Sequence, residues 1–87
     1  MQYQHYDLGY NDDGKIVEVV LRGTEANVCL MDASNFQNYR NGRRYSYFGG
    51  HYKQSPIRLA VPHSGHWHVT IDLGGYGGTI SSNVRVL

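Results

Sequence analysis

Two histidines separated by a single residue are the part of this sequence that could do chemistry. His66 and His68 lie in residues 65–73, where apolar and polar residues alternate as they do in a half-buried strand. Residues i and i+2 of a strand share a face and lie about 6.5 Å apart, so both imidazoles could bind one metal ion. Asp72 shares this face, but on a strand without a bulge it lies about 13 Å from His68, outside one coordination sphere. The other histidines that could supply a third ligand are His63, His51 and His5.

Because no third ligand is evident, these histidines are expected to be solvated side chains of a strand. The His-x-His pattern resembles the first metal motif of the cupins, which are metal-holding β-barrels, but their second motif is absent. No serine lies in a Gly-x-Ser-x-Gly turn, so a serine nucleophile has no local support. The sequence therefore predicts a protein that is not an enzyme, with no catalytic residue and no cofactor. The alternative is a metal-binding domain or metal-dependent enzyme that uses His66 and His68, with His63 as a further candidate ligand.

A second candidate site is the segment 39–53, in which arginines are interleaved with aromatic residues. Its candidate binding residues are Arg40, Arg43, Arg44, Tyr45, Tyr47 and His51. Such arginines can contact phosphates while the rings stack on bases, as in proteins that bind single-stranded nucleic acid. The same side chains can contact a sugar or an acidic patch on a protein. The net charge is only +1, from 8 Lys and Arg against 7 Asp and Glu, so a protein or small ligand is favoured over nucleic acid. The partner is not identified, self-association is open, and nothing indicates a membrane.

The spacing of turn signals predicts an all-β fold, because strands do not alternate with helices along the chain. We expect a single-domain antiparallel β-sandwich or small barrel of six to eight strands, with one short helical turn near residues 33–41. The expected strands are residues 2–8, 15–22, 26–31, 43–48, 57–61, 65–73 and 79–87. Trp67 should be buried, since its face of the strand is otherwise apolar. The glycine-rich residues 74–78 should form a hairpin turn, with Tyr76 on the surface or folded back on the core.

Length and cysteine content limit the domain organisation. The chain of 87 residues allows one all-β domain over residues 1–87. Cys29 is the single cysteine, which suits a reducing compartment. It is expected to be a small buried or half-buried hydrophobe, with a reactive thiol as the alternative. No secretory signal and no apolar stretch long enough for a membrane span is visible. A cytoplasmic location is therefore expected.

Three longer stretches together resemble one protein family. They read Tyr-Gln-His-Tyr-Asp-Leu-Gly (residues 3–9), Ala-Asn-Val-Cys-Leu-Met-Asp-Ala-Ser-Asn-Phe-Gln-Asn-Tyr (26–39) and Ser-Gly-His-Trp-His-Val-Thr-Ile-Asp-Leu-Gly-Gly-Tyr (64–76). In combination they resemble the small, mainly bacterial family called "domain of unknown function eighteen eighty-three". The resemblance implies a small all-β domain that occurs alone or joined to a Toll/interleukin-receptor domain. It implies no activity and supplies no catalytic residues.

Overall fold

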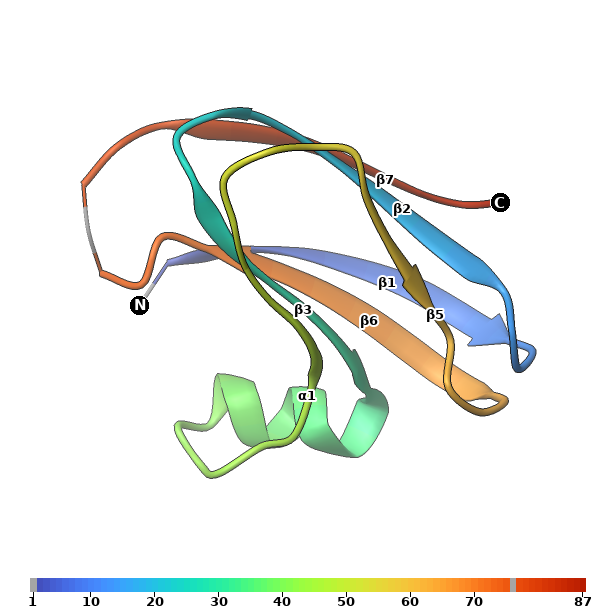
Figure 1. Cartoon of the computed structure of the whole chain (residues 1–87). Coiled ribbons are helices and arrows are strands. Elements are labelled where there is room, and N and C mark those ends of the chain that lie inside the picture. The colour runs from blue at the N-terminus through green and yellow to red at the C-terminus, as the bar shows by residue number, and fades with distance from the viewer. Residues whose placement is uncertain (1, 76) are drawn as a thin grey trace.

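The computed structural model describes residues 2–75 and 77–87 and places them in two antiparallel β-sheets and one helix (Figure 1). Within this part of the chain the elements are β1 (Tyr3–Asn11), β2 (Ile16–Gly23), β3 (Ala26–Asp32), α1 (Ala33–Arg40), β4 (Phe48–Tyr52), β5 (Ile57–Ala60), β6 (Gly65–Asp72) and β7 (Ile80–Val86). One sheet has the strand order β1-β6-β3-β4 and the other β5-β2-β7. Both sheets are open, so the expected all-β sandwich is confirmed and the closed barrel is not formed.

The main core lies between the two sheets. Alternate residues of β2, β3 and β6 point into it and are fully or almost fully buried, namely Val17, Val19, Val28, Leu30, Trp67, Val69 and Ile71. Trp67 is 2% exposed, which confirms the orientation expected for its strand. Its indole Nε1 donates a hydrogen bond of 2.9 Å to the carbonyl oxygen of His63, so the polar atom of the ring is also satisfied.

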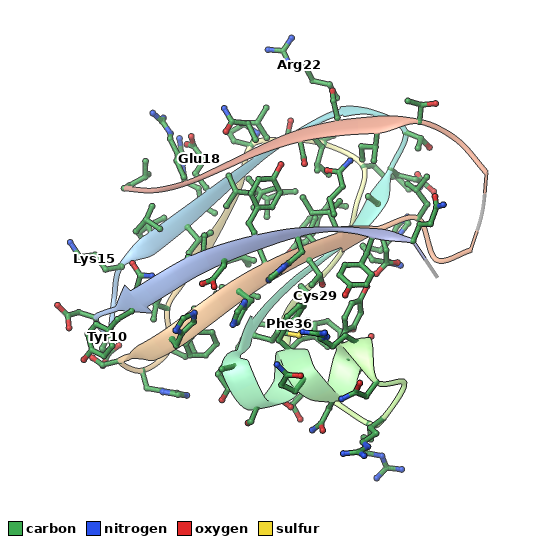
Figure 2. The ribbon with its side chains drawn as sticks, turned by 180° about the vertical axis from the view of Figure 1, so that it is seen from behind. Tyr10, Lys15, Glu18, Arg22, Cys29 and Phe36 are labelled. Carbon is green, nitrogen blue, oxygen red and sulfur yellow. The ribbon has the colours of Figure 1, made fainter. Side chains whose placement is uncertain are left out.

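Most of the polar face of β6 is buried, so the expectation of a solvated outer face was wrong, although His66 near the start of the strand is exposed. His68, Thr70 and Asp72 are 7%, 0% and 5% exposed, because α1 packs over the outer side of the four-stranded sheet (Figure 1). A second apolar cluster forms there from Cys29 and Met31 of β3 and from Phe36 and Tyr39 of α1, with partly buried Tyr3 and Tyr45 around them. Figure 2 shows Cys29 and Phe36 close together between the helix and the sheet.

The helix begins and ends at residues whose side chains or backbone suit those positions. Asp32 is its N-cap, and its Oδ1 accepts a hydrogen bond of 3.0 Å from the backbone N–H of Asn35. Gly42 follows the C-cap in a left-handed conformation, as expected for a helix end. With eight residues, α1 is too short to cross a membrane, and no other helix occurs among the described residues.

The fourth strand lies later than expected. Residues 43–47 are irregular, and strand β4 runs instead from Phe48 to Tyr52, through Gly49 and Gly50. Gly49 allows this close pairing, because a Cβ atom there would lie 2.1 Å from the carbonyl oxygen of Val28 on β3. The position predicted for Tyr76 concerns a residue outside the part of the chain that the structure describes.

Candidate functional site

The structure brings His66 and His68 together with Asp7, a carboxylate that was not among the ligands predicted from the sequence. Strand β1 pairs with β6 so that Asp7 lies opposite His68. The Oδ1 atom of Asp7 is 2.6 Å from Nε2 of His66. One possible ligand atom from each of the three residues lies within 4.8 Å of the others. We call these three residues the Asp–His cluster.

A bulge in β1 contributes to the position of Asp7. Gly9 was expected to end the first strand, but β1 continues to Asn11 with a shift of register between Asp7 and Gly9. Gly9 has a φ of 68°, which favours glycine, and its N–H donates to Oδ1 of Asp7 at 2.9 Å. This hydrogen bond has the largest effect on the pKa of Asp7, and the one from His66 has the next largest. Both lower the pKa, so the carboxylate is ionised at neutral pH.

His5 and Phe36 hold His68 from the side of the helix. The His5 ring stacks on Phe36 with centroids 4.1 Å apart, and His68 stacks on Phe36 at 4.5 Å. Nε2 of His5 is 2.8 Å from Nδ1 of His68, and the His66 ring stacks on His68 with centroids 4.8 Å apart. Burial lowers the pKa of both His5 and His68, so both are neutral imidazoles at neutral pH.

Asp72 belongs to a different network. Its Oδ2 accepts a hydrogen bond of 2.9 Å from the hydroxyl of Tyr39, and its Oδ1 accepts from Asn27 Nδ2 at 2.9 Å and from the Gly74 N–H at 2.8 Å. Burial and the neighbouring Asp72 raise the pKa of Tyr39 well above its usual range. Asp72 therefore ties the helix to the sheet.

The other candidate ligands also lie elsewhere. The His63 ring packs against Trp67 with centroids 4.9 Å apart, and its Nδ1 lies 3.3 Å from the carbonyl oxygen of Ser64. Nε2 of His51 is 3.2 Å from Oε1 of Glu25. Of the three histidines considered as a third ligand, only His5 adjoins the Asp–His cluster, and it does so through a hydrogen bond to His68.

Residues 43–48 carry aromatic side chains that rest on buried ones. Tyr45 packs edge-on against buried Tyr39 with centroids 5.0 Å apart, and Tyr47 packs against Tyr45 at 5.7 Å. The Phe48 ring lies edge-on to Trp67 at 6.3 Å. Tyr47 and Phe48 are nonetheless 48% and 45% exposed. A recess of about 170 Å³ opens beside them, lined by Leu30, Met31, Asp32, Asn35, Ser46, Tyr47, Phe48, His63 and Trp67.

The arginines of the predicted binding segment are exposed. Arg43 and Arg44 form no ion pair with any residue that the structure describes, and the guanidinium carbon of Arg40 lies 5.8 Å from the centre of the Phe36 ring. The irregular segment is nevertheless held in place: Arg43 N–H donates to the carbonyl oxygen of Asn38 at 2.8 Å, and Ser46 N–H donates to Oδ1 of Asn35 at 2.8 Å. We call Arg43, Arg44, Tyr47 and Phe48 the arginine–aromatic surface. His51, which was predicted to share it, instead contacts Glu25.

Comparison with known proteins places the chain in a family. No curated protein and no solved structure matches it. The family model described as Domain of unknown function (DUF1883) matches residues 1–87, the whole chain, as the three stretches of sequence predicted. The chain therefore belongs to the DUF1883 family.

Proposed function

We propose that this domain is a non-enzymatic recognition module that binds an acidic segment of a partner protein through the arginine–aromatic surface. The observation that carries the proposal is the pair Tyr47 and Phe48, two large neighbouring aromatic side chains that are nearly half exposed. Exposed apolar patches on small domains mark interaction sites, and aromatic and arginine side chains are enriched in the centres of protein interfaces.

The surface is held rigid before any partner binds. Phe48 rests on Trp67, and Tyr47 rests on Tyr45, which in turn packs against buried Tyr39. Ordering a mobile side chain on binding costs about 0.5–1.5 kcal/mol, and side chains already held in place avoid part of that cost. This preorganisation favours a binding role over a passive surface.

The size of the recess favours a single side chain of a protein partner. Its volume is about 170 Å³, whereas sites for drug-sized ligands and cofactors usually measure about 300–1,000 Å³. An apolar side chain of the partner would enter beside Phe48 and Trp67. Acidic residues on either side of this apolar side chain would contact Arg43 and Arg44, since guanidinium groups form bidentate hydrogen bonds with carboxylates.

The proposal that the domain is not an enzyme is supported by the state of its one thiol. Cys29 is buried under α1, and burial raises its pKa to about 11, so the reactive thiolate is scarcely formed at neutral pH.

A binding experiment with defined peptides tests the proposal. Labelled acidic peptides, each with one central Leu, Phe or Trp, would be titrated with the domain and followed by fluorescence anisotropy. We expect a subset to bind, with at least a tenfold loss of affinity for Arg43→Ala/Arg44→Ala and for Tyr47→Ala. Lys15→Ala/Arg22→Ala is the charge-matched control, since these side chains project away from α1 (Figure 2).

Two results would contradict the proposal. Tighter binding of a poly-dT oligonucleotide than of any peptide, with an affinity that falls steeply with salt, would assign the surface to single-stranded nucleic acid. Loss of the fold in Arg43→Ala/Arg44→Ala would show that the arginines are structural, since solvated surface charges usually contribute within about 0.5 kcal/mol.

A further inference from the structure

We infer that the Asp–His cluster is a binding site for a divalent transition-metal ion of the zinc type, with one carboxylate oxygen of Asp7 and one ring nitrogen each of His66 and His68 as ligands. The site is independent of the arginine–aromatic surface and of its proposed partner. It rests on side chains from two neighbouring strands, β1 and β6, whose pairing is part of the sheet.

The spacing of the ligand atoms is close to what one ion requires. Ligand atoms about 2.0–2.2 Å from a zinc ion in tetrahedral geometry lie about 3.4 Å from one another. The three atoms of the cluster lie within 4.8 Å of one another, and Asp7 and His66 already touch. Asp7 and His66 are exposed, so rotation about their side-chain bonds can bring the three atoms to that spacing, with the hydrogen bond between Asp7 and His66 given up when both bind the ion.

His68, the buried ligand, is oriented by neighbouring side chains, as histidine ligands usually are in protein metal sites. Histidine ligands usually use their second ring nitrogen in a hydrogen bond that fixes the orientation of the ring. Nδ1 of His68 bonds to His5 in this way, which leaves its Nε2 for an ion. The rings of Phe36 and His66 both stack on His68, and Gly9 N–H donates to the Asp7 carboxylate.

The donor set selects the class of ion. Two imidazoles and one carboxylate suit zinc, cobalt, nickel or copper, whereas calcium and magnesium prefer oxygen ligands alone. His68 is buried while Asp7 and His66 are exposed, so an ion can enter from solvent and water can complete its coordination.

Metal titration of the full chain, purified without an affinity tag and freed of metal with a chelator, tests the inference. Zinc binding measured by calorimetry at neutral pH should give one ion per chain. Cobalt(II) should give the visible absorption bands of a low-symmetry site with nitrogen ligands. Asp7→Asn and His66→Ala should each weaken zinc binding at least 100-fold, while circular dichroism confirms that both variants are folded.

Matched variants separate this site from general binding to surface histidines. His51→Ala and His63→Ala should bind zinc as the wild type does, because both residues lie outside the cluster. His5→Ala should weaken binding by about 10- to 100-fold, the usual effect of removing a group that orients a ligand. Zinc binding that is absent in the wild type, or equal in the wild type and Asp7→Asn, would overturn the inference and leave the cluster as a hydrogen-bonded network.

Discussion

Removing the hydroxyl group of Tyr39 tests how the helix is held on the sheet. Tyr39 is 7% exposed, and its hydroxyl donates to Oδ2 of Asp72 at 2.9 Å. Tyr39→Phe keeps the ring, which packs edge-on against Tyr3 and Tyr45, so it creates almost no cavity. Asp72 stays buried, and its other hydrogen bonds, from Asn27 and Gly74, both go to Oδ1. The substitution therefore leaves one carboxylate oxygen without its donor.

The expected loss of stability follows from that single hydrogen bond. A hydrogen bond to a charged group contributes about 1.5–3 kcal/mol, and we expect Tyr39→Phe to lower the free energy of unfolding by about 2 kcal/mol. In a domain of this size each kcal/mol shifts the thermal midpoint by about 4–8 °C, so the midpoint should fall by about 8–16 °C.

Urea and thermal unfolding, followed through Trp67 fluorescence and circular dichroism, measure the effect. Tyr47→Phe is the matched control: its hydroxyl has no hydrogen bond to the described residues, and it should unfold within about 0.5 kcal/mol of the wild type. A Tyr39→Phe variant as stable as this control would refute the reasoning, because Asp72 would then need no donor from the helix.

Three further predictions concern other parts of the domain. Gly49→Ala should lower the free energy of unfolding in urea by at least about 2 kcal/mol, because the added Cβ would lie 2.1 Å from the Val28 carbonyl oxygen. Gly77→Ala should have little effect, because apart from its chain neighbours no atom of the described residues lies within 4 Å of the added Cβ. Cys29, with its pKa raised to about 11 by burial, should react with a thiol reagent near pH 8 only after unfolding, and fast labelling of the native protein would contradict this. Glu18 accepts hydrogen bonds from Arg85 and Arg58, which lower its pKa from 4.5. The stability that ionised Glu18 contributes to the fold is therefore complete above pH 4.5 and is lost as the pH falls through the lower pKa of the folded state. Between about pH 6 and about pH 3, the thermal midpoint of Glu18→Gln should therefore fall by less than that of the wild type.

The strands could be predicted because their signals are local. The alternation in residues 65–73 identified β6 and the burial of Trp67. The same alternation suggested a wet outer face, and that conclusion failed because a helix covers it. The sequence of β3 already indicated that the outer face of this sheet is covered. Cys29 and Met31 pair with Thr70 and His68 on the outer face, so β3 is apolar on both sides. A strand that is apolar on both sides indicates a sheet covered on both faces.

The Asp–His cluster could not be assembled from the sequence, because its members are brought together by strand pairing. Asp7 and His66 are 59 residues apart, and no local pattern states that β1 lies beside β6. Gly9 added to the difficulty, since a glycine can mark the end of a strand as well as a bulge within it. Here it forms a bulge inside β1 and donates to the carboxylate of Asp7.

The short helix explains how a domain of this size can carry two candidate sites. A chain of 87 residues buries only about 60–65% of the surface that its unfolded form exposes, so a two-sheet core leaves little rigid surface for function. Helix α1 adds a second cluster outside the four-stranded sheet. Phe36 stacks on the histidines beside the Asp–His cluster, while Tyr39 supports Tyr45 beneath the arginine–aromatic surface. The two residues lie three apart on one helix, so the same short element holds both sites against one sheet.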